Sequence, residues 1–306
     1  MAASLSKEEP NIIKNLIDLS YTKNYLNLKL SQIINEPFDK FDIEILHYYQ
    51  DSVRWIINIY HQKEKKKIIA ISNPGAPKNY LISKFFLKND KGVSTYKPLF
   101  YDENNNLFFY EYISGRTFRE LVEIDKITFP SAEAKVLPTI EILKKMSFIT
   151  ADIALNRIDF AAEIEKFSRE FPNTDIDWQN FKEKFKAVHS GTSQIVHGDF
   201  QPGNLISNSK INIIDWDKAF LGDNAYDIGT FLAHTDLMFE YHYGEQESEK
   251  FKKIVLNSFS DQIKKITLAA AFVNFTIADF LSKNPNNNSE LVNKIIQKAE
   301  RYLDEQ

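Results

Sequence analysis

One short segment, residues 194–217, most constrains what this chain can fold into. It reads QIVHGDFQPGNLISNSKINIIDWD, and its short apolar runs are separated by turn-forming residues. Runs of this kind predict strands joined by tight turns, although long helical patterns lie on both sides of the segment. Five of the nine glycines fall between Gly191 and Gly229, so the backbone in this region turns sharply or passes close to another group.

Residues 204–206 and 211–214 are predicted to pair as a hairpin around the turn 207–210. Folding this hairpin places Asn204, at the start of one strand, beside Asp215, at the end of its partner, and Asp199 lies on the loop just before them. Phosphoryl transfer needs such a set. One carboxylate can orient a hydroxyl and accept its proton, while the other carboxylate and the amide oxygen hold Mg²⁺. Each residue alone could simply shape a turn, but the ordered set between two strands favours the functional interpretation.

The remainder of the chain changes from strand-like to helix-like near Gly115. The expected helices and strands are listed by residue number: helix in 7–34, strands in 41–59 and 67–72, a hairpin over 99–112, helices at about 116–124, 131–149, 157–170 and 177–189, and further helix after 217. Residues 78–88 fit a short helix or a strand. A β-rich first third followed by an α-rich remainder predicts an α+β protein with two lobes.

Composition excludes several classes of function. The net charge is −4 and lysines are interspersed with acids, so neither a nucleic-acid stripe nor a polybasic membrane segment is indicated. The apolar stretches read as too short to span a bilayer, and the start MAASLSKEEP has no apolar core typical of a signal peptide. The absence of cysteine excludes disulfides, thiolate zinc sites and cysteine nucleophiles. We expect a cytoplasmic protein.

The sequence HGDFQPGN followed by IIDWD resembles the signature of the aminoglycoside phosphotransferase and choline kinase superfamily, a branch of the protein-kinase-like fold. The resemblance is specific over 195–231 and extends by element order over about 41–280. It implies a bilobal α+β fold with a β-rich N-lobe and a mainly α-helical C-lobe. We therefore expect a helical extension and nucleotide-binding lobe in 1–110, a hinge in 111–116, and a catalytic and substrate-binding lobe in 117–306.

The same resemblance implies roles for the residues of the segment. Asp199 becomes the catalytic base, and Asn204 and Asp215 become the Mg²⁺ ligands. His197 belongs to the catalytic group, where we expect it to hold the loop by hydrogen bonds rather than to exchange protons. Asp227, in AYDIGTF, resembles the buried aspartate that anchors the catalytic loop from the following helix.

The stretch LFFYEYISG, residues 107–115, resembles the last N-lobe strand and hinge of the family. This resemblance implies that the carbonyl of Glu111 and the amide of Ile113 face the adenine edge, and that Gly115 lets the chain turn into the C-lobe. A Gly-rich phosphate loop is not found in the sequence.

The lysine that would bind the nucleotide phosphates has two possible placements. If residues 80–87 form the third strand, Lys84 pairs with the phosphates. If residues 67–72 form it, the spacing to the hinge fits better, 78–88 becomes a helix, and Ile71 stands where the lysine would be. Lys84 is the best single candidate in either alignment.

These features predict an Mg²⁺-dependent transfer of the γ-phosphate of ATP, with GTP as the alternative nucleotide, to a hydroxyl of a small polar molecule such as an aminoglycoside, choline, a sugar or a related metabolite. The alternative is a pseudoenzyme that binds nucleotide or ligand without turnover. A protein kinase is disfavoured, because no arginine follows the catalytic-loop histidine. We expect a small-molecule acceptor, neither nucleic acid nor membrane as a partner, and the sequence leaves the oligomeric state open. Residues that could contact the acceptor are His234, Asp236, Glu240, Tyr241, His242 and Tyr243, whose acids suit a cation and whose aromatics suit a sugar or a quaternary ammonium.

Overall fold

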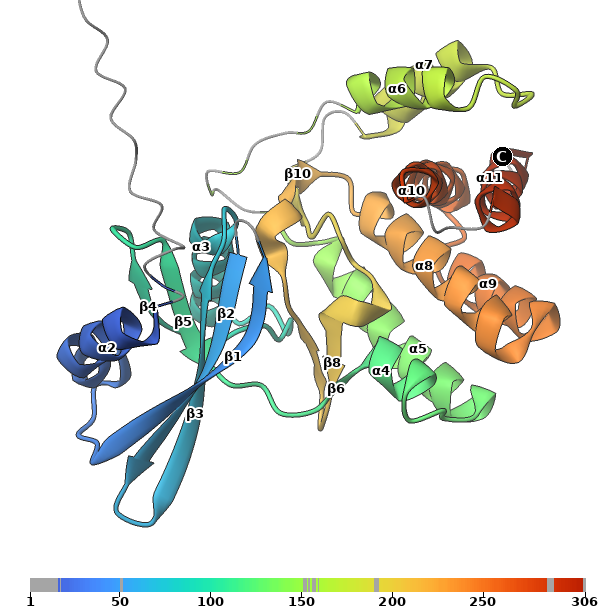
Figure 1. Cartoon of the computed structure of the whole chain (residues 1–306). Helices are drawn as coiled ribbons and strands as arrows, with labels where there is room; N and C mark the ends of the chain where they lie inside the picture. Colours follow the sequence, from blue (N-terminus) through green and yellow to red (C-terminus); the bar gives the residue numbers. More distant parts are fainter. Residues whose placement is uncertain are drawn as a thin grey trace, which may run out of the picture. The chain divides into compact units, whose positions relative to one another are not determined.

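The structure is a computed structural model that describes residues 16, 18–49, 52–150, 153, 155, 158, 160–189, 193–284 and 289–304. The chain divides into two compact units: 1–90 with 95–114, and 91–94 with 115–306. The first unit is a sheet with helices and the second is mainly helical (Figure 1). The α+β fold class predicted from the sequence is thereby confirmed.

The first unit is built on a five-stranded antiparallel sheet in the order β1-β2-β3-β5-β4. Its strands are β1 (Lys40–Tyr49), β2 (Ser52–His61), β3 (Glu64–Ser72), β4 (Pro98–Asp102) and β5 (Leu107–Glu111). The strands predicted in 41–59, 67–72 and 99–112 are therefore present, whereas residues 50 and 51, between β1 and β2, lie outside the described residues.

Successive side chains of a strand point to opposite faces of the sheet. Each face of this sheet therefore packs against a different helix. Val53, Trp55 and Ile57 of β2 are buried in one cluster with apolar side chains of α2 (Leu19–Ile34). The opposite face carries Phe108 of β5, whose ring contacts Tyr80 of a second helix, α3 (Ala76–Asn89). We call this opposite face the α3 face.

Helix α3 settles the ambiguity of residues 78–88. The breaker sequence 73–75 ends β3, and a proline in the first turn is compatible with a helix start. Ala76, Asn79, Ser83 and Phe86 are buried at the three- and four-residue spacing of one helix face. Residues 67–72 therefore belong to the third strand, and the alignment in which Lys84 lies on a strand is wrong.

The second unit combines short strands with a helical body. Its strands are β6 (Arg116–Thr117), β7 (Gln194–Val196), β8 (Leu205–Ser207), β9 (Ile211–Ile213) and β10 (Phe220–Gly222), with 3₁₀ turns at Pro202–Asn204 and Trp216–Lys218. Its helices are α4 (Phe118–Glu123), α5 (Phe129–Met146), α6 (Ala161–Glu170), α7 (Trp178–His189), α8 (Ala225–Tyr243), α9 (Glu245–Ser258), α10 (Ile263–Ser282) and α11 (Ser289–Asp304). The helices predicted before residue 190 are thus present, with shifted ends.

Helix α10 corrects one expectation from the sequence. Its 20 residues have a mean hydropathy of 1.3, so by length and composition it could cross a membrane, contrary to the expectation that the apolar stretches are too short. However, 67% of its apolar window is buried inside the protein. It packs against α8, α11, α6 and α7, which is the environment of a core helix.

Candidate active site

The predicted hairpin brings Asn204 next to Asp215. Strands β8 and β9 pair with Leu205 opposite Ile213, and the N–H of Ile214 donates to the carbonyl of Asn204 at 3.0 Å. The side-chain amide of Asn204 donates to the carbonyl of Asp199 at 2.9 Å, so its Oδ1 is the atom left to act as a ligand. The three residues that sequence reasoning selected therefore lie at one end of this hairpin.

Asp215 adopts a left-handed backbone conformation, with φ 68° and ψ 62°. The left-handed conformation costs a non-glycine residue about 1–2 kcal/mol, so this conformation persists only where the surrounding structure enforces it. The conformation turns the chain out of β9 into the 3₁₀ turn Trp216–Lys218. Backbone strain of this kind is concentrated at functional sites.

Asp227 holds the loop of residues 197–199 from the first turn of α8. Its carboxylate is fully buried and accepts the backbone N–H groups of His197 at 2.7 Å and Gly198 at 2.9 Å. Burial raises the pKa of Asp227 to about 7, although the two N–H donors act in the opposite direction. This contact matches the anchoring position that the sequence predicts for Asp227.

Gly198 is required by the geometry of this loop. Its φ is +81°, and a Cβ at this position would lie 2.3 Å from the carbonyl oxygen of Lys218. Only glycine tolerates both the conformation and this close approach. The contact holds the loop that carries Asp199 against the turn that follows Asp215.

The hydrogen bonds of His197 define its tautomer. Its Nε2 lies 2.8 Å from the carbonyl of Ile214 and must donate, whereas its Nδ1 accepts the N–H of Asp199 at 3.2 Å. Both nitrogens are thus occupied by backbone groups, which fits the expected loop-holding contact. Burial of the ring lowers the pKa of His197 to about 4, because desolvation disfavours the charged imidazolium, although the Ile214 carbonyl and Asp199 act in the opposite direction.

This depressed pKa predicts a pH dependence of stability. The unfolded imidazole has a pKa near 6.5, so the contribution of His197 is complete above about pH 6.5 and is lost as the pH falls towards about 4. We expect the free energy of unfolding to decrease over this window and the decrease to be smaller in His197→Gln. Urea unfolding at several pH values measures it, and equal slopes in both proteins would contradict this assignment.

Lys218 is a site residue that sequence reasoning missed. Its ammonium lies 3.1 Å from Oδ2 of Asp199. Burial would lower the pKa of Lys218, but the carboxylates of Asp199, Asp217 and Asp215 outweigh burial and raise it. Burial would likewise raise the pKa of Asp199, but the ammonium of Lys218 outweighs burial and lowers it. Asp199 therefore stays ionised at neutral pH. The position of Lys218, three residues after Asp215, is the only feature of the sequence that could have indicated its place in the site.

The donors suited to a cation are few. Among the described residues, no group of three or more histidine, cysteine, aspartate or glutamate side chains gathers as a metal site. Asn204 and Asp215 supply one amide oxygen and one carboxylate. Mg²⁺ typically takes one or two protein carboxylates and completes its shell with water and phosphate oxygens, so this small oxygen set fits a nucleotide-bound Mg²⁺.

The residues predicted to bind nucleotide on the first unit lie on different elements. Glu111 ends β5, where its N–H donates to the carbonyl of Lys97 and its carboxylate pairs with the Lys97 ammonium at 2.6 Å; Ile113 follows in the connecting segment. Lys84 is exposed on α3, with its ammonium 5.1 Å from the ring centre of Tyr80. The nucleotide roles of all three stay predictions.

Gly115 opens the second unit with φ +126°, and a Cβ there would lie 2.8 Å from the carbonyl oxygen of Ser207. The chain therefore needs glycine at this point, as the sequence predicts for a sharp turn.

A pocket of about 300 Å³ lies in the second unit within reach of the catalytic loop. Arg119 lines it and donates to Gln201 at 2.5 Å, and Gln201 donates in turn to Oδ1 of Asp199 at 3.2 Å. Apolar side chains from α8, α10 and α11 form much of its wall: Leu237, Met238, Ile277, Leu281, Leu291 and Ile295. We call it the acceptor pocket after the role proposed for it below; its rim is linked to Asp199 through Gln201.

The acids predicted near the acceptor are already paired. Glu240 lines the acceptor pocket but contacts Lys294 at 2.5 Å and Lys298 at 2.6 Å. Asp236 does not line it; it is a buried residue of α8 and contacts Lys298 at 2.6 Å. Of the other predicted residues, His234, Tyr241 and His242 line the pocket, whereas the Tyr243 hydroxyl donates to the carbonyl of Ile127.

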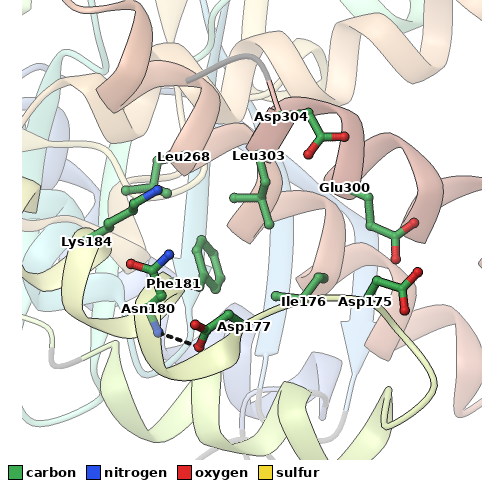
Figure 2. Close-up of a pocket in the computed structure, with 10 residues that line it drawn as sticks. All are labelled: Asp175, Ile176, Asp177, Asn180, Phe181, Lys184, Leu268, Glu300, Leu303 and Asp304. Atoms are coloured by element: carbon green, nitrogen blue, oxygen red, sulfur yellow. Dashed lines mark hydrogen bonds between the residues drawn. The ribbon is translucent and has the colours of Figure 1, made fainter.

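A second pocket of about 330 Å³ lies between α7, α10 and α11 (Figure 2). Asp175, Asp177, Glu300 and Asp304 surround an apolar floor in which Phe181 takes part. None of the predicted site residues lines this pocket. Its carboxylates are compatible with an ordinary solvated surface.

Residues 142–258 match the model of a family described as the Phosphotransferase enzyme family (APH). No curated protein matches the sequence. The matched range contains Asp199, Asn204, Asp215 and Asp227. The resemblance to the aminoglycoside phosphotransferase and choline kinase superfamily is thus confirmed.

The fold is shared with solved kinase structures at low sequence identity. A choline/ethanolamine kinase family protein from Mesorhizobium loti is 11% identical with a TM-score of 0.59, covering 92% of this chain and 95% of its own. The choline kinase LicA from Streptococcus pneumoniae is 16% identical with a TM-score of 0.54, covering 94% and 100%. The GDP and kanamycin complex of APH(2")-IIia is 13% identical with a TM-score of 0.53, covering 92% and 97%. These likenesses establish the protein-kinase-like fold.

Proposed function

We propose that this protein is a small-molecule kinase that transfers the γ-phosphate of Mg²⁺-bound ATP or GTP to a hydroxyl group. The observation that carries the proposal is the hairpin end at which Asp199, Asn204 and Asp215 meet. The loop that bears Asp199 is held from behind by Asp227 and His197. Known structures of the same fold include complexes with GDP and kanamycin, with ADP and hygromycin B, and with AMP-PNP, Ca²⁺ and amicoumacin.

In the proposed reaction Asp199 orients the acceptor hydroxyl and takes its proton as the oxygen attacks the γ-phosphorus. The bond from the γ-phosphorus to the β–γ bridging oxygen breaks, and ADP or GDP leaves with that oxygen. Its ionised state, favoured by Lys218, suits it to accept a hydrogen bond from a hydroxyl. Asn204 and Asp215 would hold the Mg²⁺, which neutralises phosphate charge when bound. Positioning and electrostatics supply most of the rate in such transfers, which is why the rigid support of the loop matters.

The acceptor pocket supports an acceptor with substantial apolar surface. Glu240 is neutralised by Lys294 and Lys298, and Glu123 lies 3.9 Å from Arg119, so the acids of the pocket are matched by bases. Burial lowers the pKa of His234 to about 4, so this side chain is uncharged at neutral pH. A wall of six aliphatic or thioether side chains then offers hydrophobic contact rather than the excess negative charge that a polycation would need.

Nucleotide binding measured by thermal shift tests this function. We expect ATP or GTP with Mg²⁺ to raise the melting temperature of the wild type, and Asp215→Ala to lose the Mg²⁺-dependent part, because the variant lacks the carboxylate ligand. Turnover against a panel of hydroxyl compounds, from aminoglycosides to apolar alcohols, then identifies the acceptor. Absence of any shift with every nucleotide would reject the proposed kinase.

The alternative is a pseudoenzyme that binds nucleotide or ligand without turnover. One observation favours it: position 71 of β3 is a buried isoleucine, where the sequence alignment expects a lysine. A Mg²⁺-dependent thermal shift with no phosphorylated product across the panel would support it.

A further inference from the structure

The described part of β3 has no cation where the sequence alignment expects one. Ile71 is 3% exposed on β3, and the lysines of this strand, Lys65, Lys66 and Lys67, stand at its other end. Helix α3 contains neither aspartate nor glutamate, so it also lacks the acid that would partner a lysine at position 71. The lysine and its acidic partner are therefore missing together, which indicates a different arrangement rather than the loss of one residue.

Arg54 of β2 stands directly opposite Ile71 in the antiparallel register. Directly opposed residues of neighbouring strands project to the same face of a sheet. Ile71 is itself opposite Phe108, and Phe108 contacts Tyr80 of α3, so Arg54 belongs to the α3 face. The neighbours of Arg54 along β2, Val53 and Trp55, are buried in the cluster under α2 on the other face.

Arg54 is partly enclosed by the protein around it. Its side chain is half-buried and its Nε atom is inaccessible to solvent. The planar guanidinium of an arginine can contact two phosphate oxygens at once. The position is thus suited to an anion.

The distance along the sheet matches the length of a nucleotide. Glu111, at the predicted hinge, is opposite Ile68 of β3, and Ile71 lies three residues further along the same strand. Three residues of strand span about 10 Å. A base bound at the predicted hinge would carry its phosphates along β3 towards the row that contains Ile71 and Arg54.

We propose that Arg54 supplies the phosphate-binding cation that β3 lacks at position 71. The cation would then come from β2, the neighbouring strand, instead of from β3. This inference rests on the proposed kinase function. Lys84, the candidate from the sequence, is exposed on α3 and lies over the Tyr80 ring. Arg54 instead rises from the sheet face on which Ile71 itself stands.

The test compares ADP with adenosine, which lacks phosphates, as ligands of Arg54→Gln. We expect this variant to bind ADP about 10- to 100-fold more weakly, the loss typical of one charge-assisted contact, with adenosine affinity unchanged within about twofold. Arg54→Lys should lose less ADP affinity than Arg54→Gln, because lysine keeps the positive charge but lacks the planar guanidinium that contacts two oxygens at once. Lys66→Gln is the matched control, since Lys66 is opposite Ile59 on the α2 face and pairs with Glu36.

A rescue variant separates a phosphate contact from general damage. Adding Ile71→Lys to Arg54→Gln returns a cation to the same row from the neighbouring strand, and it should recover most of the ADP affinity. Equal ADP affinity in Arg54→Gln and wild type would overturn the inference, as would a loss seen in Lys84→Gln instead. Equal losses for ADP and adenosine would also overturn it. If wild type binds neither ligand, the proposed function itself fails, a result distinct from all of these.

Discussion

Asp199→Asn should lower kcat for acceptor phosphorylation by about 10²- to 10⁴-fold, the contribution typical of a positioned general base. The substitution keeps the shape of the side chain but removes the carboxylate that would accept the hydroxyl proton. Lys218, 3.1 Å from Oδ2 in the wild type, would lose this ion pair. The hydrogen bonds of the residue 199 backbone to His197 and Asn204 would remain, so the loop should keep its conformation. Steady-state kinetics with the identified acceptor measures the effect.

The affinity for nucleotide distinguishes this effect from unfolding. Asp199→Asn should bind ADP as the wild type does, because the proposed metal ligands are Asn204 and Asp215. Asp125→Asn is a suitable control, since its carboxylate pairs with Arg116 at 3.3 Å on the surface of the same unit. More than a tenth of wild-type kcat in Asp199→Asn would remove Asp199 from the role of base.

Asp227→Ala should cost about 2–6 kcal/mol of stability, because it leaves the buried N–H groups of His197 and Gly198 without an acceptor, at about 1–3 kcal/mol each. The loop would also lose the contact that holds Asp199 in place, so kcat should fall in the protein that remains folded. Displacement of a reacting group by about 1 Å can cost 10²-fold in rate. Urea unfolding and kinetics at low temperature measure the two effects separately.

Asp279→Ala provides the matched comparison. Asp279 of α10 is also a nearly buried aspartate of the second unit, but its partners are the side chains of Lys166 and Lys283 at 2.8 and 2.7 Å. This variant should lose stability and keep its kcat. If Asp227→Ala also loses stability but keeps its kcat, the anchoring role of Asp227 is wrong. If Asp227→Ala is too unstable to assay, Asp227→Asn, which keeps one acceptor oxygen, gives the same comparison.

The acceptor region shows how tertiary contacts change the meaning of charged residues. Read along the sequence, Asp236 and Glu240 favour a cationic acceptor. The fold brings Lys298 of α11 between them, 2.6 Å from each, although it is 62 residues from Asp236 along the chain. The negative charge of Asp236 and Glu240 is therefore neutralised by a lysine of the protein itself. The apolar side chains of the pocket then say more about the acceptor than these two acids do.

The class of fold and the convergence of Asp199, Asn204 and Asp215 could be predicted from the amino-acid sequence alone. That convergence is local, because a tight turn and a two-strand register bring residues 204 and 215 together without help from the rest of the chain. The tertiary structure decided what depends on distant segments. It made residues 78–88 a helix, placed Arg54 opposite Ile71, set Lys218 against Asp199 and brought Asp227, 30 residues away, beneath His197. Short apolar runs fit helix and strand equally well, and charge pairs depend on which faces meet, so packing and register across the whole unit had to choose between them.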